Sequence, residues 1–181
     1  AGGLELHAAP ALVKIGTPLA EVRGAFNAVS IVGDAVGPLF FHGLGAGQMP
    51  TASAVMADLI DTVVGRAAIT FRSLKLWSDE TTAAANGRAK LADHAKSTAR
   101  FYLRFNVADR PGVLADIAGI LGRNCISIAS VIQHNHDGDD GTVPLVIMTH
   151  SATEGAMREA FEMIERLPHV RPPSSRFRVY T

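Results

Sequence analysis

The sequence has little that could support disulfide bonding or secretion. Its 181 residues include a single cysteine, Cys125, and a single tryptophan. One cysteine cannot form a disulfide within the chain, and cysteine-poor proteins are typical of reducing compartments. There is no apolar run of about 18 residues, the length at which a membrane helix is considered, and no signal-peptide pattern. These absences predict a cytoplasmic protein with no membrane partner, in which Cys125 is a small packing residue at the start of a strand.

An excess of charge of one sign is also missing. The 17 lysines and arginines balance 17 aspartates and glutamates, so the formal net charge is zero. Without a basic run, nucleic acid is not an expected partner. The length allows one or two domains, each large enough to bury a core.

The most informative segment is residues 101–114, where a strand pattern leads into a helix start. Apolar side chains alternate with polar ones at Phe101, Leu103, Phe105 and Val107, which predicts a strand with one buried face. Asp109 is then expected to cap a helix, Pro111 to set its first turn, and Gly112 to let the backbone approach a ligand. Free amides at such a helix start can hold a small anionic group such as a carboxylate.

The remainder of residues 99–181 alternates between strand and helix patterns. We expect strands at 125–132, 142–149 and 174–180, an amphipathic helix at 153–167, and a polar hairpin loop at 133–141. Ile126, Ile128 and Ile132 are expected on one face of the first of these strands. The fold class predicted is α/β (α+β), with a ferredoxin-like βαββαβ domain at residues 99–181.

Residues 1–74 are apolar and rich in glycine, and residues 75–98 read as a polar linker with one short helix near 89–96. The patterns predict strands at 26–32 and 38–42, a glycine loop at 43–47, and a helix at 51–64 that Gly65 can cap. Two strands and one helix leave a sheet edge unpaired and a face uncovered. The first part therefore reads as a partial mixed-sheet segment of a larger domain.

Residues 99–181 resemble an ACT domain, a ligand-sensing module found on many enzymes of amino-acid metabolism. The resemblance implies a regulatory amino-acid site at Asp109, Arg110 and Gly112, to which Ser127, from this chain or a neighbouring subunit, adds a polar side chain. The alternative is that the turn is only a helix start that binds nothing.

The first part resembles the end of the catalytic domain of homoserine dehydrogenase. The motifs are residues 23–29, Gly33 to Gly37, and residues 43–55 with Asp58 and Asp61 on the helix. The family interconverts aspartate semialdehyde and homoserine with NAD(P), and in many bacteria an ACT domain follows. The resemblance implies the C-terminal portion of such an enzyme, with threonine as the expected effector. The edge strand of the ACT-type sheet and the apolar surface of the first part also predict a homo-oligomer.

The same resemblance places Gly45 and Gly47 against the nicotinamide and substrate end of the cleft in the full-length enzyme. The glycine spacing argues against a primary phosphate site, and a tight connection without a ligand is equally compatible with the sequence. No catalytic residue is expected in this chain, and no cofactor for this chain alone.

The sequence is also compatible with two other functions. The first is a freestanding amino-acid-binding regulator that retains part of an enzyme. The second is a metal-binding protein that uses His134, His136 and the nearby aspartates. These residues fall in the expected hairpin loop, where short polar residues are common, so no metal ligand is predicted.

Overall fold

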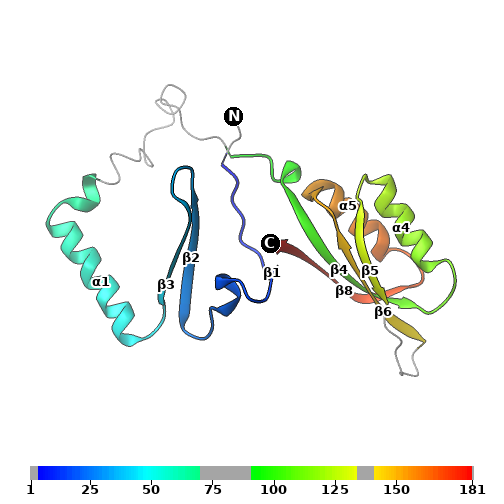
Figure 1. Cartoon of the computed structure of the whole chain (residues 1–181), viewed down its shortest axis with the longest axis horizontal. Helices are drawn as coiled ribbons and strands as arrows, with labels where there is room; N and C mark the ends of the chain where they lie inside the picture. The colour runs from blue at the N-terminus through cyan, green and yellow to red at the C-terminus, as the bar shows by residue number, and fades with distance from the viewer. Residues whose placement is uncertain (1–3, 70–90, 134–140, 181) are drawn as a thin grey trace. The chain divides into compact units, whose positions relative to one another are not determined.

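The computed structural model describes residues 4–69, 91–133 and 141–180 (Figure 1). The chain divides into two compact units, one formed by residues 1–14 with 89–181 and the other by residues 15–88. The sequence predicts a first part that runs from residue 1 to residue 74. The structure instead groups the N-terminal segment with the C-terminal unit.

Four strands of the C-terminal unit form an antiparallel sheet in the order β8-β4-β6-β5. Their bounds are Thr98–Ala108 for β4, Ile128–Gln133 for β5, Thr142–Thr149 for β6 and Val170–Tyr180 for β8. A two-residue strand, β7 (Ala152–Thr153), pairs with the start of β4. This is the order of a ferredoxin-like sandwich, so the predicted βαββαβ architecture is confirmed.

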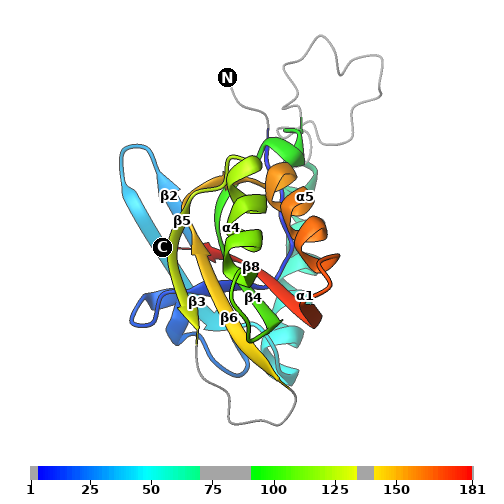
Figure 2. The ribbon, with the colours of Figure 1, turned by 90° about the vertical axis from the view of Figure 1, so that its right-hand side faces the viewer.

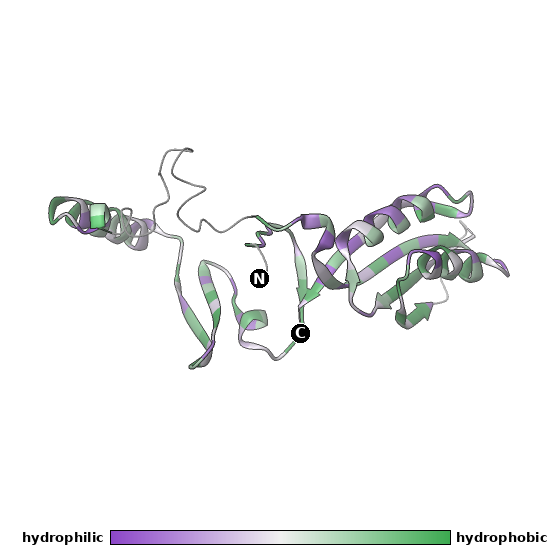
Figure 3. Ribbon diagram, turned by 90° about the horizontal axis from the view of Figure 1, so that it is seen from above, coloured by the Kyte–Doolittle hydropathy of each residue, from purple (hydrophilic) through white to green (hydrophobic). Residues whose placement is uncertain are grey.

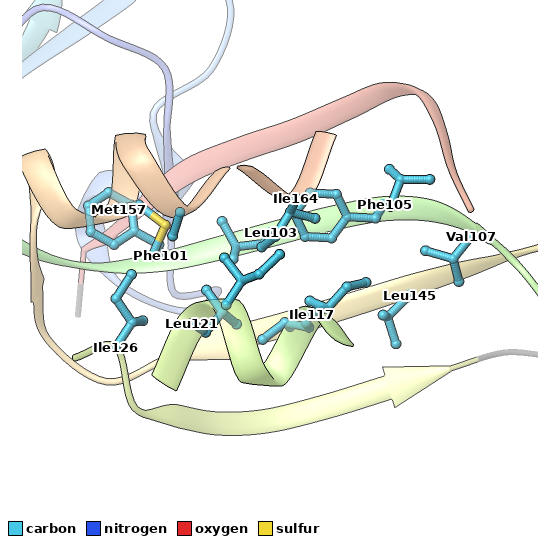
Figure 4. Packing of buried hydrophobic residues seen from close by; sticks show 14 of the residues in the cluster. Phe101, Leu103, Phe105, Val107, Ile117, Leu121, Ile126, Leu145, Met157 and Ile164 are labelled. Atoms are coloured by element: carbon cyan, nitrogen blue, oxygen red, sulfur yellow. The ribbon is translucent and has the colours of Figure 1, made fainter. Parts of the chain in front are cut away.

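Two amphipathic helices, α4 (Val113–Arg123) and α5 (Glu154–Glu165), cover one face of this sheet (Figure 2). The predicted alternation along β4 is confirmed, since its four apolar side chains are at most 2% exposed. Figure 4 shows the helices and strands meeting in one core, which includes Phe101, Leu103, Phe105, Val107, Ile117, Leu121, Leu145, Met157 and Ile164. Burial of these side chains at roughly 1.5–3 kcal/mol each supplies the main stabilisation of the unit.

A fifth strand, β1 (Ala11–Val13), joins this sheet from the other end of the sequence. It pairs in parallel with β8, and Leu12 lies opposite Val179. The segment before it is also held, because the amide of Ala92 donates to the carbonyl of Leu4 at 2.9 Å. A 3-10 turn at His94–Lys96, capped by Asp93, follows Ala92 and occupies part of the region where a short helix is expected.

The second unit contains a hairpin and a helix but no buried residue within 15–69. Strand β2 (Phe26–Gly33) pairs with β3 (Gly37–Leu44), after a 3-10 turn at Pro18–Glu21 and before helix α1 (Gln48–Val63). Gly65 follows the helix with a φ of 77°, as a C-terminal capping glycine should. Apolar residues are spread along β2, β3 and α1 (Figure 3). Those with exposed side chains include Phe26, Val29, Ile31, Phe40, Phe41, Leu59 and Ile60.

Strand β5 differs from its prediction in one physical respect. The pairing register with β6 shifts between Ile128 and Ser130, and such an irregularity turns the following side chains away from the alternation. Ile126, before the irregularity, is buried, whereas Ile132, after it, is 46% exposed. Cys125 precedes the strand and is exposed, so the prediction that it is a small packing residue at the start of a strand is wrong.

Candidate functional site

The turn between β4 and α4 is the best-defined candidate site. Gly112 is the N-cap residue of α4, with a φ of 94°, and no side chain caps the helix. The prediction that Asp109 is the cap is wrong, because the helix begins at Val113 and the capping position falls on a glycine. A positive φ at this point is what glycine adopts without steric cost.

This turn opens into a hollow of about 400 Å³. The hollow brings together three of the four predicted effector-site residues, Asp109, Arg110 and Gly112. Its floor is apolar, from Val107 and Leu145. A small hollow with one acidic side chain, one basic side chain and an uncapped helix start can hold the two charges of an amino acid.

Ser127 does not line this hollow within one chain. It lies just before β5, where its carbonyl accepts from the amide of His150 at 2.9 Å. Gln133, at the other end of β5, does line the hollow, and six residues of strand separate the two by about 20 Å. Sequence reasoning missed Gln133 because it assigned this residue to the hairpin loop.

A buried histidine, His169, stands behind the turn and was also missed. Its Nδ1 lies 3.3 Å from a guanidinium nitrogen of Arg110. A guanidinium can only donate, so Nδ1 accepts and Nε2 carries the hydrogen. That Nε2 has no hydrogen-bond partner and lies 3.6 Å from the carboxylate of Asp116. The carbonyl of His169 accepts from the amide of Ala108 at 2.8 Å, which ties it to the end of β4.

The glycine loop of the second unit is a tight strand-to-helix connection. The amides of Gly45 and Ala46 both donate to the carbonyl of Ala25, at 3.1 and 3.3 Å. The side chain of Asn27 lies where a Cβ on Gly45 would stand, and Gly47 caps α1 with a φ of 124°. Because these loop amides are already bonded, they do not form a phosphate cradle of the kind that a dinucleotide needs.

The residues described in the structure contain no group of three or more histidine, cysteine, aspartate or glutamate side chains that could hold a metal ion. His134, His136 and the aspartates between them and Gly141 lie outside the described residues. Within the described parts of the chain, no helix is long and apolar enough to cross a bilayer.

The fold and the turn site together define the C-terminal unit as an ACT-type domain, and the model of the ACT domain family matches residues 101–167. The homoserine dehydrogenase family model matches residues 1–60. The chain belongs to the homoserine dehydrogenase family and corresponds to the C-terminal portion of its members, the end of the catalytic domain followed by an ACT domain.

Individual relatives agree over nearly the whole chain. It is 36% identical to a homoserine dehydrogenase of Pseudomonas aeruginosa over 177 residues, which are 98% of this chain and 40% of that protein. It is 36% identical to the Mycobacterium tuberculosis enzyme over 173 residues, 94% of this chain and 37% of that protein. A homoserine dehydrogenase structure from Thiobacillus denitrificans is 34% identical, with a TM-score of 0.76 over 99% of this chain and 40% of that chain. The chain thus spans about two fifths of the length of these relatives.

Proposed function

We propose that this chain is the regulatory end of a homoserine dehydrogenase, an enzyme that interconverts aspartate semialdehyde and homoserine with NAD(P). In this proposal the ACT domain binds threonine as a feedback effector. The observation that carries the proposal is the hollow at the β4–α4 turn, which lies in an ACT domain attached to a homoserine dehydrogenase segment.

The hollow offers a complementary group for each part of an amino acid. The uncapped start of α4 and the guanidinium of Arg110 attract the carboxylate. The carboxylate of Asp109 attracts the ammonium group. Gln133 at the end of β5 lines the hollow, and its side-chain amide, which can both donate and accept, suits the hydroxyl group of threonine.

A second copy of the chain is the proposed source of Ser127. Strand β5 forms one edge of the sheet, and its Val131 and Ile132 are 38% and 46% exposed. An edge strand with unpaired backbone groups can pair across a two-fold axis. A homo-oligomer assembled through this edge would bring Ser127 of one subunit toward the turn of the other.

The test is titration calorimetry of the chain with L-threonine, with D-threonine and L-valine as matched ligands. L-threonine should bind and D-threonine should not. L-valine, which replaces the hydroxyl by a methyl group, should bind more weakly. Asp109→Ala should weaken L-threonine binding by about 1–3 kcal/mol. Glu159→Ala, which removes an exposed carboxylate on α5, is the control and should leave the affinity for L-threonine unchanged. If Asp109→Ala and Glu159→Ala bind L-threonine equally well, the proposed site is wrong.

The main alternative, a freestanding amino-acid-binding regulator, is less well supported. None of residues 15–69 is buried, and a hairpin and helix with this much exposed apolar surface are marginal alone. Such a surface favours a segment that belongs to a larger domain. In that domain we propose that Gly45 and Gly47 lie at the nicotinamide end of the cleft, while the phosphates are held by residues outside this chain.

A further inference from the structure

The segment before β1 belongs to one domain by sequence and to another by structure. The homoserine dehydrogenase family model begins at residue 1, yet residues 1–14 form a compact unit with the ACT domain. Strand β1 extends the ACT sheet beyond β8. A piece of the catalytic-domain sequence is therefore a strand of the regulatory sheet, and it continues directly into the second unit at Ile15.

A charged cluster anchors this segment next to β1. Arg178 on β8 donates to a carboxylate oxygen of Glu154 from Nε at 3.0 Å and from Nη2 at 2.7 Å. Nη2 also donates to the Ser97 hydroxyl at 3.2 Å, and Nη1 lies 3.1 Å from the imidazole of His7. The Ser97 hydroxyl in turn donates to the carboxylate of Glu5, which also contacts His7.

The Arg178–Glu154 pair at the centre of this cluster is largely withdrawn from solvent, whereas Glu5 on the N-terminal segment is 43% exposed. The side chains of Arg178 and Glu154 are 12% and 7% exposed, and the amide of Glu154 donates to the carbonyl of Ser97 at 2.8 Å. Ion pairs with this degree of burial are screened little by salt, and removal of one partner is far more disruptive than at an exposed pair. The buried pair therefore holds Arg178 against the start of α5, and Arg178 in turn contacts the N-terminal segment through His7 and, by way of the Ser97 hydroxyl, through Glu5.

Strand β8 connects this anchor with the effector turn. Its first residue, Val170, pairs with Val107 at the end of β4, and His169 immediately before it contacts Arg110. Arg178 lies eight residues further along, about 26 Å away at the rise of an extended strand. One continuous strand thus touches the effector turn at one end and the catalytic-domain segment at the other.

We propose that the N-terminal segment, residues 4–13, is the coupling element through which an occupied effector site acts on the catalytic part, with Arg178 as its anchor. The inference rests on the proposed function, because it requires an effector at the β4–α4 turn. Binding there shifts the strand β8, and the anchored segment follows because it is a strand of the same sheet.

Hydrogen exchange of the chain with and without saturating L-threonine is the test. In the wild type, threonine should slow exchange at residues 107–114 and change the exchange rates at residues 4–13 by threefold or more. Arg178→Met keeps the aliphatic stem but removes the guanidinium. This variant should retain the protection at 107–114 and lose the change at 4–13. Arg166→Met is the matched control and should behave like the wild type, because Arg166, the residue that follows α5, forms only an exposed pair with Glu162 at 3.9 Å.

The outcomes separate the two proposals. Protection at the turn without any change at residues 4–13 of the wild type overturns the coupling and leaves the effector site standing. A threonine-induced change at residues 4–13 that is as large in Arg178→Met as in the wild type also overturns the coupling. No effect of threonine anywhere overturns both. If Arg178→Met does not fold, Ser97→Ala removes only the hydroxyl that links Arg178 to Glu5 and should reduce the change at 4–13 in the same way. If the change at residues 4–13 in Ser97→Ala is as large as in the wild type, the cluster around Arg178 is not the anchor.

Discussion

The amide of Ile126 donates to the carbonyl of Leu121 at 2.9 Å and so closes the C-terminus of α4 around Cys125. A second bond runs from the amide of Cys125 to the carbonyl of Gly122 at 3.0 Å. These are the two bonds of a Schellman motif, in which the residue at the Cys125 position adopts a left-handed conformation. Cys125 has a φ of 58°, where a side chain costs about 1–2 kcal/mol and glycine costs little.

Cys125→Gly should therefore raise the free energy of unfolding by about 0.5–1 kcal/mol, after allowance for the greater chain entropy of unfolded glycine. Cys125→Val should lower it by about 1–2 kcal/mol, because a β-branched side chain tolerates this conformation poorly. Cys125→Ala is the control and should differ little from the wild type. Urea denaturation measures all three, and a glycine variant less stable than the wild type would contradict the assignment of strain to this residue.

The contact between His169 and Arg110 predicts an effect on effector binding. His169→Leu replaces the imidazole with an apolar group of similar volume, so the free energy of unfolding should change by less than about 1.5 kcal/mol. The guanidinium of Arg110 loses its acceptor, and the affinity for L-threonine should fall by about 1 kcal/mol, roughly a fivefold rise in Kd. Titration calorimetry and urea denaturation on the same samples separate the two effects.

Asp116→Ala is the control for His169. Its carboxylate lies 3.6 Å from the other ring nitrogen and is 60% exposed, so its removal should cost no more than about 0.5 kcal/mol in either measurement. If both variants weaken threonine binding equally, the imidazole does not act through Arg110.

The anchor of the N-terminal segment should weaken in acid. The hydrogen bond from Ser97 and the contact with His7 lower the pKa of Glu5 below its ordinary value of 4.5. A carboxyl group whose pKa is lowered in the folded state stabilises that state above the ordinary pKa, and the stabilisation disappears as the pH falls through the folded value. Hydrogen-exchange protection factors at residues 4–13 should therefore fall as the pH is lowered below the ordinary pKa of 4.5. Glu5→Gln cannot titrate, and protection in this variant should not follow the same curve.

The sequence could predict the parts of the fold that local patterns determine. The alternation along β4 specified which side chains are buried, and the bounds of β6 follow from its own apolar pattern. Strand β1 could not be predicted, because its three residues pair with a strand more than 160 residues away and carry no local signal. The face of Ile132 depends on a register irregularity, which alternation alone does not encode.

The candidate site was predictable to a similar extent. The residue types of the turn indicated Asp109, Arg110 and Gly112, which line one hollow. The true capping residue, Gly112, has no side chain to show its role, so Asp109 was the more obvious candidate. His169 comes from the start of another strand, and only the tertiary fold brings it to Arg110.

Assembly is expected from the exposed apolar surfaces. Val131 and Ile132 on the edge strand β5, together with the uncovered second unit, are apolar areas that association would bury. Light scattering at micromolar concentration should show a dimer or a larger species. If the edge of β5 forms the contact, Val131→Lys should shift the distribution toward smaller species, because lysine on an edge strand opposes pairing. A monomeric wild type would contradict the expectation.

The chain by itself should not interconvert homoserine and aspartate semialdehyde. The amides of Gly45 and Ala46 are already bonded to Ala25, so this loop does not supply the phosphate contacts that hold a dinucleotide. Hydride transfer requires the cofactor to be bound and oriented against the substrate. Incubation of the purified chain with NADP and homoserine should therefore give no NADPH absorbance above background. The relevant control adds L-threonine, which should bind the ACT domain in the same sample and so show that the inactive protein is folded. Turnover that co-purifies with the chain through successive columns would contradict this prediction. It would mean that this chain binds the cofactor although the amides of Gly45 and Ala46 are already bonded to Ala25.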